Sequence, residues 1–218
     1  MNNLNKNIYF HVGISKTGST FLQKRVFPKL SKITYIPTNK YHRVFEEIKN
    51  SDSNKVLVSR EFDRQFEREV TLFSIRHRTA NPVIVLRKHE EYLESQYKRF
   101  IKNGFRGGIE DFFDIKNDEG FFKILHLSFS YQVDVLKDKF EKEPIVLFHE
   151  DLKSNPKKFI KQFCSLTFSD IDLEKVNFNE KHISYSEKQL KAIKVVSKYF
   201  NLKKRVVFRS PLIHVFLL

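Results

Sequence analysis

The sequence predicts a single-domain α/β fold, with a mainly parallel central sheet flanked by helices. Short apolar runs alternate with longer segments in which apolar residues recur at helical spacing, the pattern of parallel strands joined by helices. The 218 residues are enough to bury one hydrophobic core. No repeat and no Gly/Ser-rich or Pro-rich linker divides the sequence, so we treat residues 1–218 as one domain.

The individual elements follow from the apolar pattern and from the residues that interrupt it. The expected strands are residues 8–12, 33–36, 56–59, 83–86 and 145–148. The expected helices are residues 19–30, 41–49, 66–78, 90–102, 120–140 and 186–200, together with one that begins at residues 155–156. Gly104, Gly107 and Gly108 predict a loop between two of these helices.

The composition is basic and contains a single cysteine. A net charge of +14 favours a polyanionic partner, such as nucleic acid, anionic lipid, an acidic glycan or a multiply phosphorylated nucleotide. A solvated Lys-rich surface is the alternative. The one cysteine, Cys164, excludes an internal disulfide and a Cys-rich metal site. Because it stands in an apolar helical run, we expect it to be buried as a small hydrophobic residue.

The two ends of the chain differ in character. Residues 1–7 are polar and lack the apolar core of a signal peptide, so we expect a cytoplasmic location. Residues 201–218 are apolar with basic residues at intervals, too short and too interrupted to span a bilayer. This C-terminal tail either packs on the core or lies on the inner face of the membrane as a peripheral contact.

The most informative segment is residues 9–23, which read YFHVGISKTGSTFLQ. An apolar strand leads into a turn between Gly13 and Gly18, and hydroxyl residues then open a helix. A helix N-terminus leaves backbone N–H groups unpaired and carries a partial positive charge, so it favours an anion. The glycines let the backbone approach the anion closely, and Lys16 adds a mobile positive charge.

The spacing differs from that of the nucleotide triphosphatase loop, in which the lysine directly follows the second glycine. Here Lys16 precedes Gly18, and the loop is shorter. The segment therefore predicts a P-loop-like phosphate site after the first strand, but not the ordinary ATP-binding loop.

The string GISKTGSTFLQ resembles the 5′-phosphosulfate loop of sulfotransferases that use 3′-phosphoadenosine-5′-phosphosulfate (PAPS). Ser15 stands where a proline is common in that family. The resemblance implies that the 5′-phosphosulfate is held by Ser15, Lys16, Thr17, Gly18, Ser19 and Thr20. It also implies PAPS as the sulfuryl donor, adenosine 3′,5′-bisphosphate as the product, and no metal ion.

A second motif agrees with the same family, whose 3′-phosphate site is a strand-end arginine followed eight residues later by a serine. Arg87 ends the run VIVLR, and Ser95 lies eight positions on. An arginine suits a phosphate because its planar group donates two parallel hydrogen bonds.

Two further stretches support the resemblance, which covers residues 8–200. The segment PIVLFHEDL resembles a late strand and turn of the family, in which we interpret Glu150 and Asp151 as mainly structural and expect Asp151 to cap a turn. The segment KHISYS resembles a loop that closes over the nucleotide, which implies that His182 and Ser184 contact it. Ser186 is equally well explained as the N-cap of the last helix.

Two residues are candidates for the base that removes the acceptor proton, while Lys16 is expected to stabilise the leaving phosphate. Glu61 follows the strand at 56–59, and His42 follows the strand at 33–36. Both lie where the carboxyl ends of parallel strands place a ligand site. We favour Glu61, because its anchored backbone fixes the direction of its carboxylate. The sequence shows no cluster of residues at metal-ligand spacing.

The expected function is therefore sulfuryl transfer from PAPS to a hydroxyl or an amine. The resemblance is to small bacterial enzymes of the carbohydrate type, so the expected acceptor is a glycan or glycolipid. A P-loop-type nucleoside or sugar kinase is the first alternative, and it requires an acidic Mg²⁺ ligand at a strand end. A basic nucleic-acid-binding protein is the second, but we find no nucleic-acid-reading motif and expect no such partner.

Overall fold

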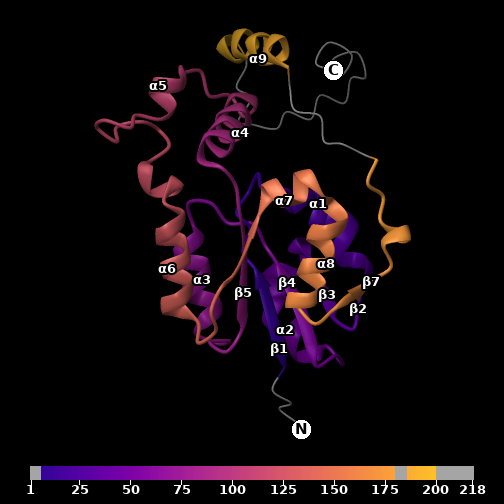
Figure 1. Cartoon of the computed structure of the whole chain (residues 1–218). Coiled ribbons are helices and arrows are strands. Elements are labelled where there is room, and N and C mark those ends of the chain that lie inside the picture. Colours follow the sequence, from indigo (N-terminus) through magenta and orange to yellow (C-terminus); the bar gives the residue numbers. More distant parts are fainter. Residues whose placement is uncertain (1–5, 180–185, 200–218) are drawn as a thin grey trace. The chain divides into compact units, whose positions relative to one another are not determined.

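The structure, a computed structural model, describes residues 6–179 and 186–199 (Figure 1). These form two compact units. The first comprises residues 6–88 and 128–179, and the second comprises residues 89–127 and 186–199.

The first unit is built on a five-stranded sheet in the order β3-β4-β1-β5-β6, in which every neighbouring pair is parallel. Its strands are β1 (Asn7–His11), β3 (Thr34–Ile36), β4 (Lys55–Ser59), β5 (Asn81–Leu86) and β6 (Ile145–Phe148). All five predicted strands are confirmed, with ends that shift by one or two residues. An antiparallel pair, β2 (Leu30–Ser31) with β7 (Asp170–Ile171), was not predicted.

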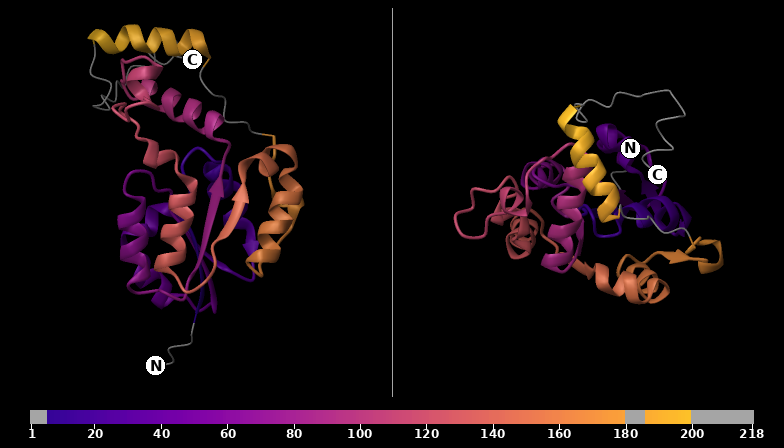
Figure 2. Two further views of the ribbon diagram at one scale, coloured as in Figure 1. Left: turned by 60° about the vertical axis from the view of Figure 1, so that its left-hand side comes forward. Right: turned by 90° about the horizontal axis from the view of Figure 1, so that it is seen from above.

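One face of the sheet is covered by α3 (Phe66–Ser74) and α6 (Phe129–Lys139) (Figure 2). Phe10 of β1 stacks on Phe73 of α3 with ring centroids 3.8 Å apart. The short helices η3 (Thr38–Arg43) and α2 (Val44–Asn50) follow β3.

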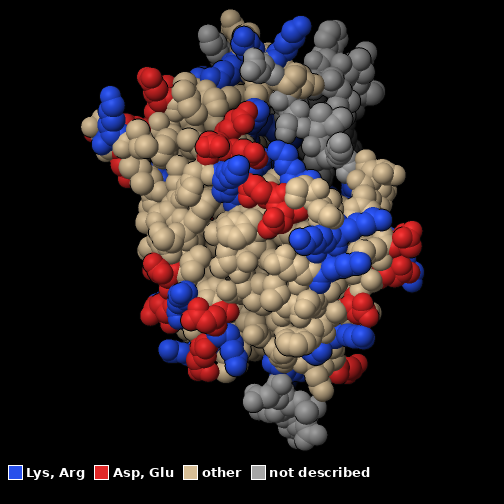
Figure 3. Space-filling view, viewed as in Figure 1, with Lys and Arg blue, Asp and Glu red and all other residues tan. Residues whose placement is uncertain are grey.

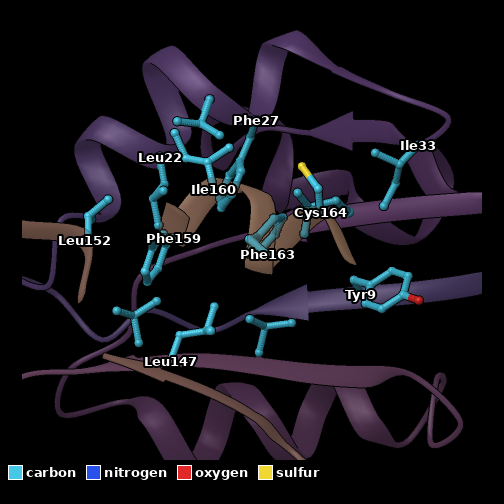
Figure 4. Packing of buried hydrophobic residues seen from close by; sticks show 14 of the residues in the cluster. Tyr9, Leu22, Phe27, Ile33, Leu147, Leu152, Phe159, Ile160, Phe163 and Cys164 are labelled. Carbon is cyan, nitrogen blue, oxygen red and sulfur yellow. The ribbon is translucent and has the colours of Figure 1, made fainter. Parts of the chain in front are cut away.

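The opposite face carries an extensive apolar cluster (Figure 4). The helices here are α1 (Ser19–Phe21), a π-helical turn η1 (Leu22–Val26), η2 (Phe27–Lys29), α7 (His149–Ser154) and α8 (Pro156–Leu166). Tyr9, Phe27 and Phe163 are fully buried in this cluster. Cys164 is also buried there as a free thiol, as predicted. A short helix, η5 (Leu173–Lys175), follows β7.

The predicted start of α8 is confirmed in detail. Asn155 is the N-cap, its side chain accepts from the Lys158 N–H at 3.0 Å, and Pro156 takes the first helical position, where its missing N–H is not needed.

The second unit contains α4 (His89–Lys102), α5 (Ile109–Phe112), η4 (Ile124–Leu127) and α9 (Glu187–Tyr199). Its interior is aromatic, with Phe112 fully buried among Tyr97, Phe100 and Phe122. Ser186 caps α9: the Gln189 N–H donates to its hydroxyl (3.3 Å), and its own N–H donates to the Gln189 side chain (2.8 Å).

The predicted long helix over residues 120–140 is wrong. Its first part contains only the short η4, and α6 begins after Ser128, whose hydroxyl accepts from the Tyr131 N–H at 3.4 Å. A Cβ on Gly120 would lie 2.6 Å from the Asp114 backbone nitrogen, so the chain doubles back closely there. The described helices are all too short or too polar to cross a bilayer, and the tail at 201–218 lies outside the described residues.

Candidate active site

The phosphate loop lies at the carboxyl edge of the sheet, where the strand order reverses. After β1 the chain builds β3 and β4 on one side, and then β5 and β6 on the other. Open α/β sheets bind ligands at such a switch point. The start of the loop is held from both sides: the Phe62 N–H donates to the Val12 carbonyl at 3.2 Å, and the Val85 N–H donates to the Gly13 carbonyl at 2.7 Å.

Both glycines of the loop are required by their surroundings. Gly13 (φ +100°) and Gly18 (φ +85°) adopt left-handed conformations that disfavour a side chain. A Cβ on Gly18 would lie 2.5 Å from Cδ2 of Leu152, and a Cβ on Gly13 would lie 3.2 Å from Cα of Glu61. The loop therefore packs directly against α7 and against the segment that follows β4.

The loop hydroxyls are directed into the protein. Thr17 and Ser19 both donate to the Ile14 carbonyl, at 2.7 and 3.0 Å, and Ser15 donates to Asp63 at 2.5 Å. All three serine and threonine side chains are buried. These three hydroxyls therefore stabilise the conformation of the loop. Thr20 is half-buried, and contact of these four residues with a phosphosulfate stays a prediction. The sequence did not indicate that the Asp63 carboxylate would accept a hydrogen bond from Ser15.

Two cationic residues meet at this loop. Lys16 is exposed and has φ +68°, an unusual backbone conformation for a residue other than glycine. Nη1 of Arg87, at the end of β5, donates to the Lys16 carbonyl at 3.0 Å. The structure therefore brings together the two motifs that the sequence suggested for the two ends of the nucleotide.

The remaining predicted nucleotide contacts are Ser95, His182 and Ser184, and they stay predictions. Ser95 lies half-buried on α4 of the second unit. His182 and Ser184 lie outside the described residues. The structural interpretation of Glu150 is supported, since its carboxylate accepts from the Lys88 N–H at 2.9 Å and so joins α7 to the end of β5.

Glu61 lies beside the phosphate loop. The N–H groups of its neighbours, Arg60 and Phe62, donate to the His11 and Val12 carbonyls at 3.0 and 3.2 Å, which extends the pairing of β4 with β1. The Phe62 ring packs against Phe10, with centroids 5.9 Å apart. Burial raises the pKa of Tyr35, and the negative charge of Glu61 adds to this shift, which indicates that Glu61 lies near Tyr35 of β3.

His42 has a different environment from Glu61. It is exposed on η3, and its Nδ1 lies 3.0 Å from the Asn39 carbonyl within the same turn. Its neighbour Tyr41 points inward instead, with its ring centroid 5.6 Å from that of Phe62.

A buried polar group behind the loop was missed by sequence reasoning. His11 Nδ1 lies 2.8 Å from Ser59 Oγ, and the Gln23 amide donates to the same oxygen at 3.0 Å. Complete burial lowers the pKa of His11 to about 3. Polar residues at the ends of two apolar strands were the available signal. Ser59 is 48 positions from His11 and 36 positions from Gln23 in the sequence, so the contacts could not be foreseen.

The surface of the first unit is basic in places. Figure 3 shows Lys and Arg side chains over α8, where Lys157, Lys158 and Lys161 are exposed. Acidic side chains lie among the basic ones on the same face. A polyanionic macromolecular partner therefore stays a prediction.

The fold and the loop together define an α/β protein with a P-loop-like turn at the switch point of its sheet. Among solved structures, a sulfotransferase from Alicyclobacillus acidocaldarius matches 94% of this chain and 97% of its own, with a TM-score of 0.59 and 12% identity. Mouse sulfotransferase SULT7A1, crystallised with PAP, matches 92% of this chain and 68% of its own, with a TM-score of 0.51 and 13% identity.

At these identities the likeness establishes the fold: the chain has the fold of the sulfotransferases. No model of a known protein family matches it, and no curated protein matches it in sequence. The predicted fold class is confirmed.

Proposed function

We propose that this protein is a PAPS-dependent sulfotransferase. The observation that carries the proposal is the phosphate loop, with Lys16 between two obligatory glycines and with Arg87 bonded to its backbone. This arrangement offers two cations to one polyanionic nucleotide at the switch point of the sheet. The likeness of the fold to a sulfotransferase crystallised with PAP supports the same nucleotide.

In this proposal Lys16 and the start of the helical run at Ser19 hold the 5′-phosphosulfate, and Arg87 holds the 3′-phosphate. The loop glycines keep the backbone close enough for its N–H groups to donate to the anion. Lys16 neutralises the negative charge that develops on the leaving phosphate as the bond between sulfur and the bridging oxygen breaks.

Glu61 is the residue to which we assign removal of the acceptor proton. Its backbone is held to β1 on both sides, and its Cα lies 3.2 Å from the position that a Cβ on Gly13 would take. A positioned base needs fixed geometry within reach of the acceptor oxygen. The exposed position of His42, whose ring is bonded within its own turn, makes it the weaker choice.

The acceptor in this proposal is a carbohydrate hydroxyl, on a glycan or a glycolipid. It rests on the resemblance of the sequence motifs to those of small bacterial sulfotransferases.

Calorimetry with adenosine 3′,5′-bisphosphate tests the nucleotide assignment. We expect saturable binding that neither ATP with Mg²⁺ nor duplex DNA reproduces. Tighter binding of ATP with Mg²⁺ would favour the kinase alternative, and binding of DNA alone would favour a nucleic-acid-binding protein.

A further inference from the structure

Three segments that surround the reaction site in the first unit are joined by one buried hydroxyl. Ser59 ends β4 and lies two residues before Glu61, and His11 ends β1 and lies two residues before Gly13. Gln23 belongs to the π-helical turn that follows the phosphate loop. His11 Nδ1 and Gln23 Nε2 lie 2.8 and 3.0 Å from Ser59 Oγ, so both ends of the phosphate loop are connected to the strand that carries Glu61.

The sheet register places these groups on one face. His11 and Ser59 are direct partners in the parallel pairing of β1 with β4. Glu61 follows Ser59 by two residues, just past the end of β4. Ser59 and Glu61 both affect Tyr35 of β3. Burial raises the pKa of Tyr35 to about 12, the Ser59 hydroxyl opposes this shift, and the negative charge of Glu61 adds to it.

The use of polar residues here requires an explanation, because the adjacent pair on the same face, Tyr9 and Leu57, belongs to the apolar cluster. His11 and Ser59 are fully buried, and Phe27 packs edge-on against the His11 ring with centroids 5.3 Å apart. Burying polar groups is unfavourable unless they are hydrogen-bonded, whereas apolar side chains would fill the space without directional contacts. Hydrogen bonds add a fixed geometry that apolar packing lacks.

The end of β4 is held at its backbone as well. The Thr38 hydroxyl donates to the Ser59 carbonyl at 2.9 Å, and the Arg60 N–H donates to the His11 carbonyl at 3.0 Å. The strand end is therefore fixed from β1, from η3 and from the helical run after the loop, directly before Glu61.

We propose that His11, Gln23 and Ser59 form a positioning network that sets the place of the Glu61 carboxylate relative to the phosphate loop. The inference rests on the proposed function and extends it: the network touches neither nucleotide nor acceptor and acts through Glu61. A network of this kind lowers the turnover number when it is broken, and leaves nucleotide affinity nearly unchanged.

The test is a double-mutant comparison with Glu61→Gln. Ser59→Ala removes the shared hydroxyl, and Gln23→Met keeps the length of the side chain without its amide. Each should lower kcat by about 10- to 100-fold, the scale for a base displaced by about 1 Å, with the Kd for adenosine 3′,5′-bisphosphate within about twofold. In the Glu61→Gln background the same changes should cost less than about threefold, since the residue through which they act is already inactive.

The matched control is Ser74→Ala, which removes another buried serine hydroxyl, bonded to the Thr71 carbonyl on α3. It should leave kcat unchanged. If Ser59→Ala lowered kcat as much in the Glu61→Gln background as in the unaltered chain, the proposed network would be wrong. Unchanged kcat in the single variants would also overturn it. Binding of the bisphosphate and sulfate transfer by the unaltered chain test the proposed function independently of the network. A chain that does neither overturns both.

Discussion

The burial of His11 predicts a specific loss of stability in acid. The perturbation is a shift from pH 7 to pH 4.5, applied to the unaltered chain and to His11→Asn. Burial lowers the pKa of His11 from its ordinary value of 6.5 to about 3 in the folded chain. Below pH 6.5 the unfolded chain therefore takes up a proton that the folded chain does not bind.

The sign and size follow from this difference. The contribution of neutral His11 to the free energy of unfolding is complete above pH 6.5, and it is lost progressively as the pH falls toward 3. Each pH unit in this window lowers the free energy of unfolding by about 1.4 kcal/mol, so two units to pH 4.5 cost about 2.7 kcal/mol. Burial also lowers the pKa of His77, which adds a smaller loss in the same direction.

Urea unfolding followed by far-ultraviolet circular dichroism at several pH values measures the effect. His11→Asn should be less stable than the unaltered chain at pH 7, but its stability should fall by about 2–3 kcal/mol less on going to pH 4.5. Because His77 and the paired carboxylates are common to both chains, the difference isolates His11. Equal slopes for the two chains would show that His11 is not held neutral in the folded protein, and the reasoning would fail.

Other predictions concern the nucleotide site. Lys16→Ala should lower kcat more than it weakens nucleotide binding, and a raised KM with unchanged kcat would limit Lys16 to holding the donor. Arg87→Ala should weaken binding of adenosine 3′,5′-bisphosphate by roughly 2–4 kcal/mol, and unchanged affinity in calorimetry would refute its assignment. Gly18→Ala should destabilise the chain by at least roughly 1–2 kcal/mol, for the left-handed backbone alone, and displace Leu152. Gly108→Ala, where a Cβ meets ordinary contacts, should change thermal stability little; equal effects at both positions would contradict this account.

The centre of the sheet was predictable because β1, β4 and β5 are buried on both faces. Continuous apolar runs such as residues 83–86 leave little choice of structure, and all five strands were found. The helix predicted over residues 120–140 failed because its apolar spacing continues through a tight turn. At Gly120 the turn requires the absence of a side chain, and the cap at Ser128 marks the true start of α6.

The candidate site was predictable where one short segment carries the chemistry. The phosphate loop combines glycines, Lys16 and a helix start within a few residues. The bonds of Ser15 to Asp63 and of Arg87 to Lys16 span 48 and 71 positions, so they arise only when the chain folds. For the same reason nothing local indicated that Ser59 would bond to His11.

The central claim is that this chain transfers a sulfuryl group from PAPS, and mass spectrometry of the acceptor tests it most directly. The unaltered chain and Glu61→Gln are incubated with PAPS and with a panel of glycans, lipids and phenols. We expect a glycan to gain one sulfuryl group while adenosine 3′,5′-bisphosphate is released, at a rate about 10²–10⁴-fold lower with Glu61→Gln. A chain that leaves PAPS intact with every acceptor, yet phosphorylates one of them from ATP and Mg²⁺, would contradict it.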